Sequence, residues 1–254
     1  QVHVAWGVPV LPAVILVVFV FGPLFGAVVE RGIMRGIEGA SDVVKIVVTI
    51  SLMVALIGIA NVIWNPNVGR PVQPFFSGVV EVLGVPVSYH RLLTLGVAVV
   101  VAGALAWMFR FTRLGIGMRA VVDDRSLMRL NGGRPDRISM LSWALGAGMA
   151  AIAGVLLASE QTLSATTLTL LLLNAYAVAV VGRLRSLPGV FLGAVILGLA
   201  QSYVIGYLNQ ESTIGPVSLR AVSQALPPVM LFAVMLFQPQ DRLTAKGTAR
   251  RSTP

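Results

Sequence analysis

The sequence predicts an all-α protein, a polytopic bundle of about seven membrane-spanning helices in one transmembrane domain over residues 1–254. Hydrophobic residues make up 56% of the chain, and the mean hydropathy is +0.86. Only 11% of the residues are charged, whereas soluble domains carry about 25%. The apolar residues gather in blocks near the ~17–25 residues that a helix needs to cross a bilayer. An ordinary soluble fold is therefore excluded.

Seven apolar segments follow one another along the chain. They cover residues 8–29, 43–64, 92–109, 138–158, 168–181, 187–208 and 219–237. The fifth has only about 14 residues, so it either crosses the membrane or re-enters on one side. Segment 65–89, rich in proline, predicts an irregular loop at the outer interface. That loop would cap an access path, dock an external protein or simply connect two spans.

The largest polar segment is residues 110–137, which we call the charged island. It holds seven arginines and three aspartates. Apolar positions recur at helical spacing over residues 118–130 and predict one short amphipathic helix. This helix would dock on a soluble partner, lie on anionic lipid or remain a solvated loop.

Glycine and proline set the expected ends of this helix. Gly115 and Gly117 are expected to turn the chain off the third span. The Asn131-Gly132-Gly133 run is expected to end the helix, since glycine favours the position just past a helix C-terminus. Pro135 is expected to delay the next helix until residue 138.

The distribution of Lys and Arg predicts the orientation. The connector 30–45, the charged island, Arg183, Arg185 and the tail hold 16 of the 19 basic residues. The opposite connectors hold only Arg70, Arg91 and Arg220. Because basic connectors stay on the inner side, the island and a disordered tail over 240–254 are predicted to be cytoplasmic.

The residue inventory excludes several functions. Cysteine is absent and the two histidines are isolated, so no metal site is expected. Residues 115–120 match GxGxxA but follow an apolar span instead of a strand, which argues against nucleotide binding. Because no GxxxxGK[ST] motif occurs, any ATP must be hydrolysed by another subunit. The spans lack the ionisable groups of a proton-coupled transporter or an intramembrane enzyme. Nucleic-acid binding is not expected, because the basic residues lie in short connectors.

Polar and small residues within the spans suggest a path and a packing scheme. The candidate path residues are Thr49, Ser51, Asn174, Tyr176 and Gln201. Asn174, in the short fifth segment, either lines a cavity or bonds to a neighbouring helix. Small residues four apart predict close helix packing. These rows are Gly22 with Gly26, and Gly146 with Ala150 and Gly154.

Several segments resemble one transporter family. The run TRLGIGMRAVVDDRSLMRLNGGRPDR and the span after it closely resemble the signature of permease subunits of branched-chain amino-acid-type ABC importers. VVTISLMVAL, VAVVGRLRSLPGVFLGAVILGL and QPQDRL resemble further stretches of that family. The resemblance implies a non-catalytic subunit of the bacterial inner membrane that transports small solutes. It places Arg119, Asp123, Asp124, Leu127 and Gly132 on a loop that couples to an ATPase.

The same resemblance implies partners. They are a second permease, two cytoplasmic ATPases that bind ATP and Mg, and an extracytoplasmic solute-binding protein. Arg183 and Arg185 stand where the family has glycines, so a close backbone approach is not expected there. The N-terminal spans of the family have no counterpart, so we expect a shortened chain or a separate half. A stand-alone channel and a sugar-type ABC permease remain alternatives, and the solute stays open.

Overall fold

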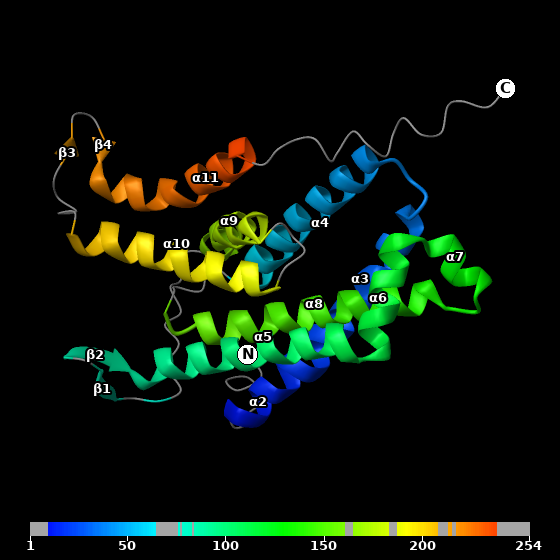
Figure 1. Cartoon of the computed structure of the whole chain (residues 1–254), viewed down its shortest axis with the longest axis horizontal. Helices are drawn as coiled ribbons and strands as arrows, with labels where there is room; N and C mark the ends of the chain where they lie inside the picture. Colours follow the sequence, from blue (N-terminus) through cyan, green and yellow to red (C-terminus); the bar gives the residue numbers. More distant parts are fainter. Residues whose placement is uncertain are drawn as a thin grey trace. The chain divides into compact units, whose positions relative to one another are not determined.

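The computed structural model shows a protein built mainly of helices (Figure 1). It describes residues 10–64, 76, 78–82, 84–160, 165–182, 187–207, 213–214 and 217–237. Residue contacts divide the chain into two compact units, Gln1–Thr167 and Leu168–Pro254. Each unit is described by itself. The predicted tail at 240–254 lies outside the described residues.

The first unit opens with a helical rod and a second apolar helix. The rod comprises α2 (Val10–Leu16), the π-helical turn η1 (Val17–Phe21) and α3 (Gly22–Gly32). The 3-10 turn η2 (Met34–Ile37) leads to α4 (Asp42–Ile63). Ser41, in an extended conformation, precedes α4, as serine commonly does at a helix start. Both predicted segments are thus helical, and the rod continues beyond the expected residue 29.

A β-hairpin follows within the segment predicted to be irregular. Strands β1 (Val79–Val82) and β2 (Val85–Ser88) pair antiparallel, with Val79 opposite Ser88 and Val82 opposite Val85. The prolines directed the expectation toward a loop, but the valines in VVEV and VPVS favour strands. The expectation was wrong for 79–88. Residues 65–75 lie outside the described part of the chain.

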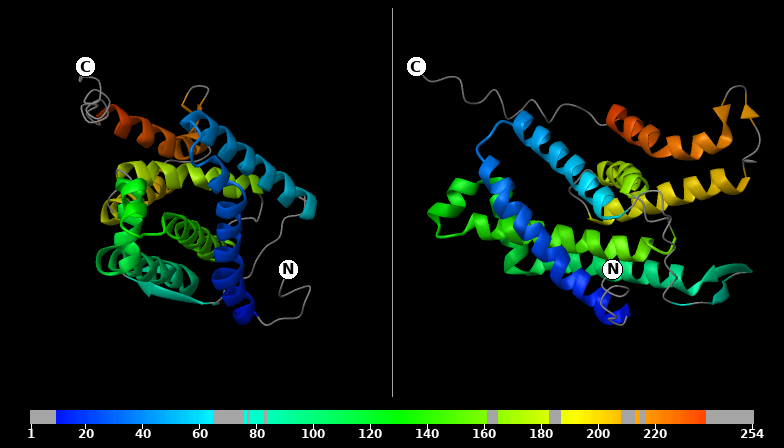
Figure 2. Two further views of the ribbon diagram at one scale, coloured as in Figure 1. Left: turned by 90° about the vertical axis from the view of Figure 1, so that its right-hand side faces the viewer. Right: turned by 180° about the vertical axis from the view of Figure 1, so that it is seen from behind.

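Four helices complete the first unit. They are α5 (Tyr89–Phe111), α6 (Arg113–Asp123), α7 (Arg125–Leu130) and α8 (Pro135–Leu157). The hairpin lies at one end of α5, and α6 and α7 lie at the other (Figure 1). At the hairpin end His90 is buried, and its Nε2 lies 2.9 Å from the Leu156 carbonyl oxygen of α8. The start of α5 therefore meets the end of α8, and Figure 2 shows the two helices running antiparallel.

Helices α3 and α8 cross at very small residues. A β-carbon on Gly22 would lie 3.0 Å from Ala151 Cβ and 3.2 Å from Gly148 Cα. A β-carbon on Gly26 would overlap the Trp143 carbonyl and lie 2.8 Å from Ala147 Cβ. The predicted role of Gly22 and Gly26 is confirmed, since without side chains they let the two backbones approach.

The row expected on α8 is not the one that faces α3. A β-carbon added to Gly146 or Gly154 would have no neighbour within 4 Å. Gly148 lies at the crossing instead, where an added β-carbon would meet Pro23 Cγ at 3.4 Å. Four-residue spacing marks a stripe of small residues, but it does not say which stripe a neighbouring helix uses.

The second unit contains three helices and a short hairpin. They are α9 (Ala165–Val181), α10 (Leu187–Tyr207), β3 (Thr213–Ile214), β4 (Val217–Ser218) and α11 (Leu219–Phe237). Helices α10 and α11 pack together. Gly182 approaches the next helix closely, because a β-carbon there would lie 2.7 Å from Val190 N. Residues 183–186, which include Arg183 and Arg185, lie outside the described part.

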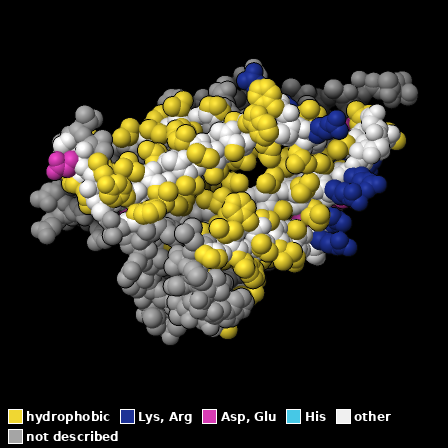
Figure 3. All heavy atoms as spheres, turned by 90° about the horizontal axis from the view of Figure 1, so that it is seen from below, with side chains coloured by type: hydrophobic (Ala, Val, Ile, Leu, Met, Phe, Trp, Pro, Cys, Tyr) yellow, Lys and Arg dark blue, Asp and Glu magenta, His cyan; other side chains and the backbone are white. Residues whose placement is uncertain are grey.

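Five helices of the described residues are long and apolar enough to cross a membrane. They span Pro12–Ile37, Asp42–Ile63, Tyr89–Phe111, Pro135–Leu157 and Pro188–Gly206. Many of their large apolar side chains are exposed, and Figure 3 shows such side chains over much of one face. An apolar exterior suits contact with lipid. Helix α9 has 17 residues, about 25 Å at 1.5 Å each, so the seven-crossing topology stays a prediction.

Candidate functional site

The charged island starts with a sharp turn at Thr112. Thr112 is extended, with φ −104° and ψ 153°, and its Oγ1 accepts a hydrogen bond from Gly115 N at 3.2 Å. Gly115 and Gly117 lie inside α6 and are buried. The expectation that they turn the chain was wrong. Their missing side chains instead let α6 approach the backbone of Met108 and Phe109 and the side chain of Ile138.

Two helices occupy the stretch 118–130, so the expectation of a single helix was wrong. Helix α6 ends at Asp123, and Asp124 is extended, with φ −155° and ψ 108°. Asp124 Oδ1 accepts hydrogen bonds from Ser126 N at 2.9 Å, Leu127 N at 3.0 Å and Ser126 Oγ at 2.6 Å. These bonds, that of the Ser126 hydroxyl foremost, lower the pKa of the Asp124 carboxyl. Asp124 therefore caps α7 in its charged form.

Removing this cap is expected to fray α7. Asp124→Ala should raise amide hydrogen exchange over residues 125–130, because the amides of Ser126 and Leu127 lose their acceptor. Asp124→Asn should preserve most of the protection, since asparagine caps about as well as aspartate. Because the folded-state pKa is lowered, the charged cap acts above the usual carboxyl pKa and is lost as pH falls through the lowered value. Equal exchange in both variants would contradict this role.

The C-terminal end of α7 confirms the predicted stop. Gly132 has φ +75°, a conformation that glycine adopts without strain. Gly132 N donates to Arg129 O at 3.0 Å, and Gly133 N donates to Met128 O at 2.9 Å. This pair of bonds is the Schellman arrangement of helix ends. Pro135 then begins α8 as its first residue, so α8 starts earlier than the expected residue 138.

The two short helices present apolar side chains on their outer surface. Val122 and Leu130 are each 84% exposed, and Leu127 is 56% exposed. Met118, expected on the same face, is buried instead. Arg119 and Asp123, on the same helix as Val122, are also exposed. We call Val122, Leu127 and Leu130 the apolar tip. These exposed apolar side chains on an otherwise polar segment make it a candidate interaction surface.

An ion-pair cluster that includes two arginines of α7 is a functional candidate that the sequence did not predict. Glu30, at the end of α3, is fully buried. Arg35 in η2 donates from Nη2 to Glu30 Oε2 at 3.0 Å and to the Asp136 carbonyl oxygen at 3.5 Å. A buried carboxylate requires such a partner, because desolvation of an unpaired charge is costly.

The cluster continues into the charged island. Arg125 of α7 pairs with Glu38, which follows η2, and with Asp136 Oδ1 at 3.3 Å. Arg129 Nη2 donates to the same Asp136 oxygen at 3.0 Å. We call these residues the charge network: Glu30, Arg35, Glu38, Arg125, Arg129 and Asp136. The opposite charges of the connector 30–45 and the island were visible in the sequence, but their pairing was not.

The predicted path residues are distributed over both units. Thr49 and Ser51 lie exposed on α4, and Thr49 Oγ1 donates to the Ile46 carbonyl of its own helix at 2.9 Å. On α9, Asn174 is half-buried and Tyr176 is exposed, and Gln201 of α10 is half-buried. Thr49 and Ser51 belong to the first unit and the other three to the second. These residues stay predictions.

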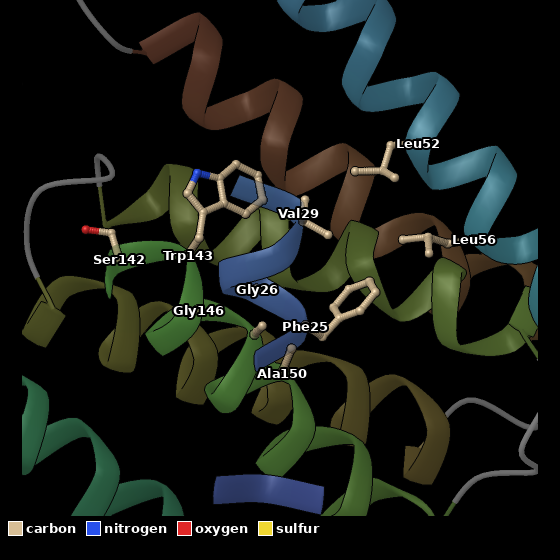
Figure 4. Close-up of a pocket in the computed structure, with 10 residues that line it drawn as sticks. Phe25, Gly26, Val29, Leu52, Leu56, Ser142, Trp143, Gly146 and Ala150 are labelled. Carbon is tan, nitrogen blue, oxygen red and sulfur yellow. The ribbon is translucent and has the colours of Figure 1, made fainter. Parts of the chain in front are cut away.

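An apolar groove of about 490 Å³ lies between α3, α4 and α8. It is lined by Phe25, Gly26, Val29, Leu52, Leu56, Ser142, Trp143, Gly146, Ala147 and Ala150. Figure 4 shows Phe25 and Val29 on α3, with Leu52 and Leu56 on the neighbouring α4. The Ser142 hydroxyl donates to the Ile138 carbonyl at 2.9 Å. The lining suits aliphatic groups and offers no charged partner to a zwitterion.

A family model matches nearly the whole chain. The model described as "Branched-chain amino acid transport system / permease component" matches residues 2–237. The chain belongs to this family. Its apolar helices are therefore those of a polytopic transport permease, and the predicted family and fold class are confirmed.

Curated relatives carry consistent names. The permease protein LivH of the high-affinity branched-chain amino acid transport system of Escherichia coli K12 is 35% identical over 109 residues, 42% of this chain and 35% of that protein. BraD of Pseudomonas aeruginosa, a permease protein of such a system, is 27% identical over 185 residues, 70% of this chain and 60% of BraD. The permease thus spans about a third to three fifths of the relatives it matches. No solved structure gives a significant match.

Proposed function

We propose that this permease is the membrane subunit of an ATP-driven importer for branched-chain amino acids or related small solutes. It would be non-catalytic, because ATP would be hydrolysed by a separate subunit. The apolar tip carries this proposal. Leu127 and Leu130 of the tip lie on α7, a helix with a defined start and a defined end, as contact with a force-producing partner requires.

The proposal assigns a role to each predicted coupling residue. Asp124 and Gly132 hold the ends of α7, and Leu127 inserts its side chain into the ATPase. Arg119 and Asp123 are the exposed charges that orient the contact. The proposed complex contains a second permease, two ATPases that bind ATP and Mg, and an extracytoplasmic solute-binding protein.

The names of the relatives support the substrate class. LivH and BraD are named for high-affinity transport of branched-chain amino acids. We assign the path to Thr49, Ser51, Asn174, Tyr176 and Gln201, whose side chains supply polar contacts within largely apolar helices. Of the side chains that line the apolar groove, only those of Ser142 and Trp143 carry polar atoms, so the groove is not assigned to the path.

Reconstitution in proteoliposomes tests the proposed function. The permease is combined with its companion permease, ATPase and binding protein, and uptake of radiolabelled leucine is followed with and without ATP. Uptake that needs both ATP and the ATPase supports the importer. Leucine flux through this permease alone would replace it with a channel. Uptake of radiolabelled ribose and not of leucine under the same conditions would favour a sugar importer.

The proposed orientation is checked by cysteine labelling. The chain has no cysteine, so Leu130→Cys and Val85→Cys each give a single thiol at an exposed position. Impermeant maleimide should label Leu130→Cys only in inside-out vesicles and Val85→Cys only in intact spheroplasts. The two sites lie at opposite ends of α5, which has 23 residues and is about 35 Å long. The reverse labelling pattern would invert the topology.

A further inference from the structure

The charge network joins three segments that are distant in the sequence. Glu30 lies at the end of α3, and Arg35 and Glu38 lie in the connector that leads to α4. Arg125 and Arg129 lie on α7, and Asp136 lies in the first turn of α8. The Arg35 to Asp136 bond alone spans 101 positions of sequence. Two groups of ion pairs, Glu30 with Arg35 and Arg125 with its partners, are therefore joined by the hydrogen bond from Arg35 to the Asp136 carbonyl. Together they contact the ends of α3, α7 and α8 and the approach to α4.

We propose that the charge network is the link that carries a displacement of α7 to the transmembrane helices. Arg125 is its central positioning residue, because it binds Glu38 on the α4 side and Asp136 on the α8 side. This role rests on the proposed function, in which an ATPase seats on the apolar tip. The tip makes the contact, and the network transmits the movement.

Helix α7 depends on such anchoring. It has only six residues, and isolated helices of that length are not stable in water. Its capped ends fix its conformation but not its position on the protein. Within the described residues, its charged contacts outside the charged island are those of Arg125 with Glu38, so the pair fixes α7 to the connector.

Burial separates this network from ordinary surface ion pairs. Exposed ion pairs contribute little to stability, because solvent screens their charges. The Glu30 side chain is only 1% exposed, and those of Arg125 and Glu38 are each 29% exposed. Partial burial raises the strength of the Glu30–Arg35 and Arg125–Glu38 pairs and the cost of separating them. The pair of Arg129 with Asp136 is more exposed, at 57% and 45%. A displaced α7 would therefore move its partners with it.

The network also retains capacity to rearrange. Arg35 Nε and Arg125 Nε are buried and make no hydrogen bond to the described residues. Buried donors normally find partners, so an arrangement of the helices that brought an acceptor to either atom would be favoured. A link that exchanges partners between two arrangements is a physical basis for coupling.

A double-mutant cycle in the assembled transporter tests the link. Glu38→Gln and Arg125→Gln are compared alone and together, with leucine-stimulated ATP turnover and retention of the ATPase as readouts. Each single variant should retain the ATPase but lower stimulated turnover about fivefold to tenfold, within the usual range of coupling effects. The double variant should fall no further than Arg125→Gln, because the two residues act through one contact. Additive losses, or unchanged turnover in both single variants, would overturn the proposal.

A matched control and an independent measurement complete the test. Asp42→Asn removes an acid from the same connector, where Asp42 pairs with Lys45 at 3.7 Å and its side chain is 97% exposed. It should leave turnover within about twofold of the parent, as expected for an exposed pair. In the isolated permease, Arg125→Gln should raise hydrogen exchange over both 34–37 and 125–130. If the unsubstituted permease retains no ATPase, the proposed function fails. If hydrogen exchange over 34–37 and 125–130 is unchanged in Arg125→Gln, the role of the charge network is overturned.

Discussion

Gly26→Leu is expected to abolish the native packing of α3 on α8. A β-carbon at this position would already overlap the Trp143 carbonyl, and Leu adds three further carbons. The carbonyl belongs to the α8 backbone, so it cannot move aside as a flexible side chain does. Overpacking commonly costs about 1–3 kcal/mol, and a clash with backbone lies at or above the upper end. The thermal midpoint of detergent-solubilised protein should fall sharply, with loss of monodisperse material on size exclusion.

Gly32→Leu is the matched control on the same helix. A β-carbon on Gly32 would meet nothing within 4 Å, so the same substitution should be tolerated there. Within a helix, propensity favours Leu over Gly by up to about 1 kcal/mol, so propensity cannot explain a loss of stability in Gly26→Leu. Gly26→Ala should give an intermediate loss. Equal midpoints for Gly26→Leu and Gly32→Leu would show that the crossing is not as close as described.

Leu127→Asp should separate the permease from its proposed ATPase. Leu127 is more than half exposed on α7, so a charge there creates no buried defect within the permease. In the complex the same charge would be buried against an apolar groove. Loss of such a contact costs on the order of 1–3 kcal/mol, about tenfold or more in affinity. Co-purification of the ATPase should drop accordingly, while the thermal midpoint of the permease stays unchanged.

Leu127→Met keeps an apolar side chain of similar volume and should retain the ATPase. If both variants lose the ATPase, the substitutions disturb α7 itself, and hydrogen exchange over 125–130 would reveal that disturbance. Full retention by Leu127→Asp would remove the apolar tip from the interface.

The long helices were predictable because apolar runs and interrupting polar segments carry most of the information. The bounds of α11 match the predicted 219–237. The stop at Gly132 was also predictable, since the signal is local to the residue that adopts a positive φ. Where one residue type strongly favours one conformation, the sequence alone predicts that conformation.

Competing local signals account for the errors. Asp124 lies between helix-forming neighbours, and the periodicity of the apolar positions continues through it, so the break between α6 and α7 was hidden. The DDRS run did contain a cap signal, because aspartate is a favoured residue at the start of a helix. In the 79–88 hairpin, valines outweighed the proline that suggested a loop.

Long-range pairing could not be predicted from one sequence. Each member of the charge network is an ordinary connector residue by composition. Only the crossing of α3 with α8 brings Arg35 to Asp136. Gly148 lies at that crossing instead of Gly146 because of how α8 is rotated about its own axis. That rotation also depends on long-range packing, so one sequence could not predict it.

The π-helical turn at Val17–Phe21 changes the direction in which the side chains of the first span point. Ala13 on α2 and Val29 on α3 are both buried. In an uninterrupted α-helix, residues sixteen positions apart would point about 160° from one another, on nearly opposite sides. A π turn acts as a one-residue insertion, which reduces the difference to about 60°. The buried residues of α2 and α3 thereby face the same side of the rod. Deletion of a single residue within this turn would rotate the buried face of α2 away from that of α3, although the composition of α2 would be unchanged.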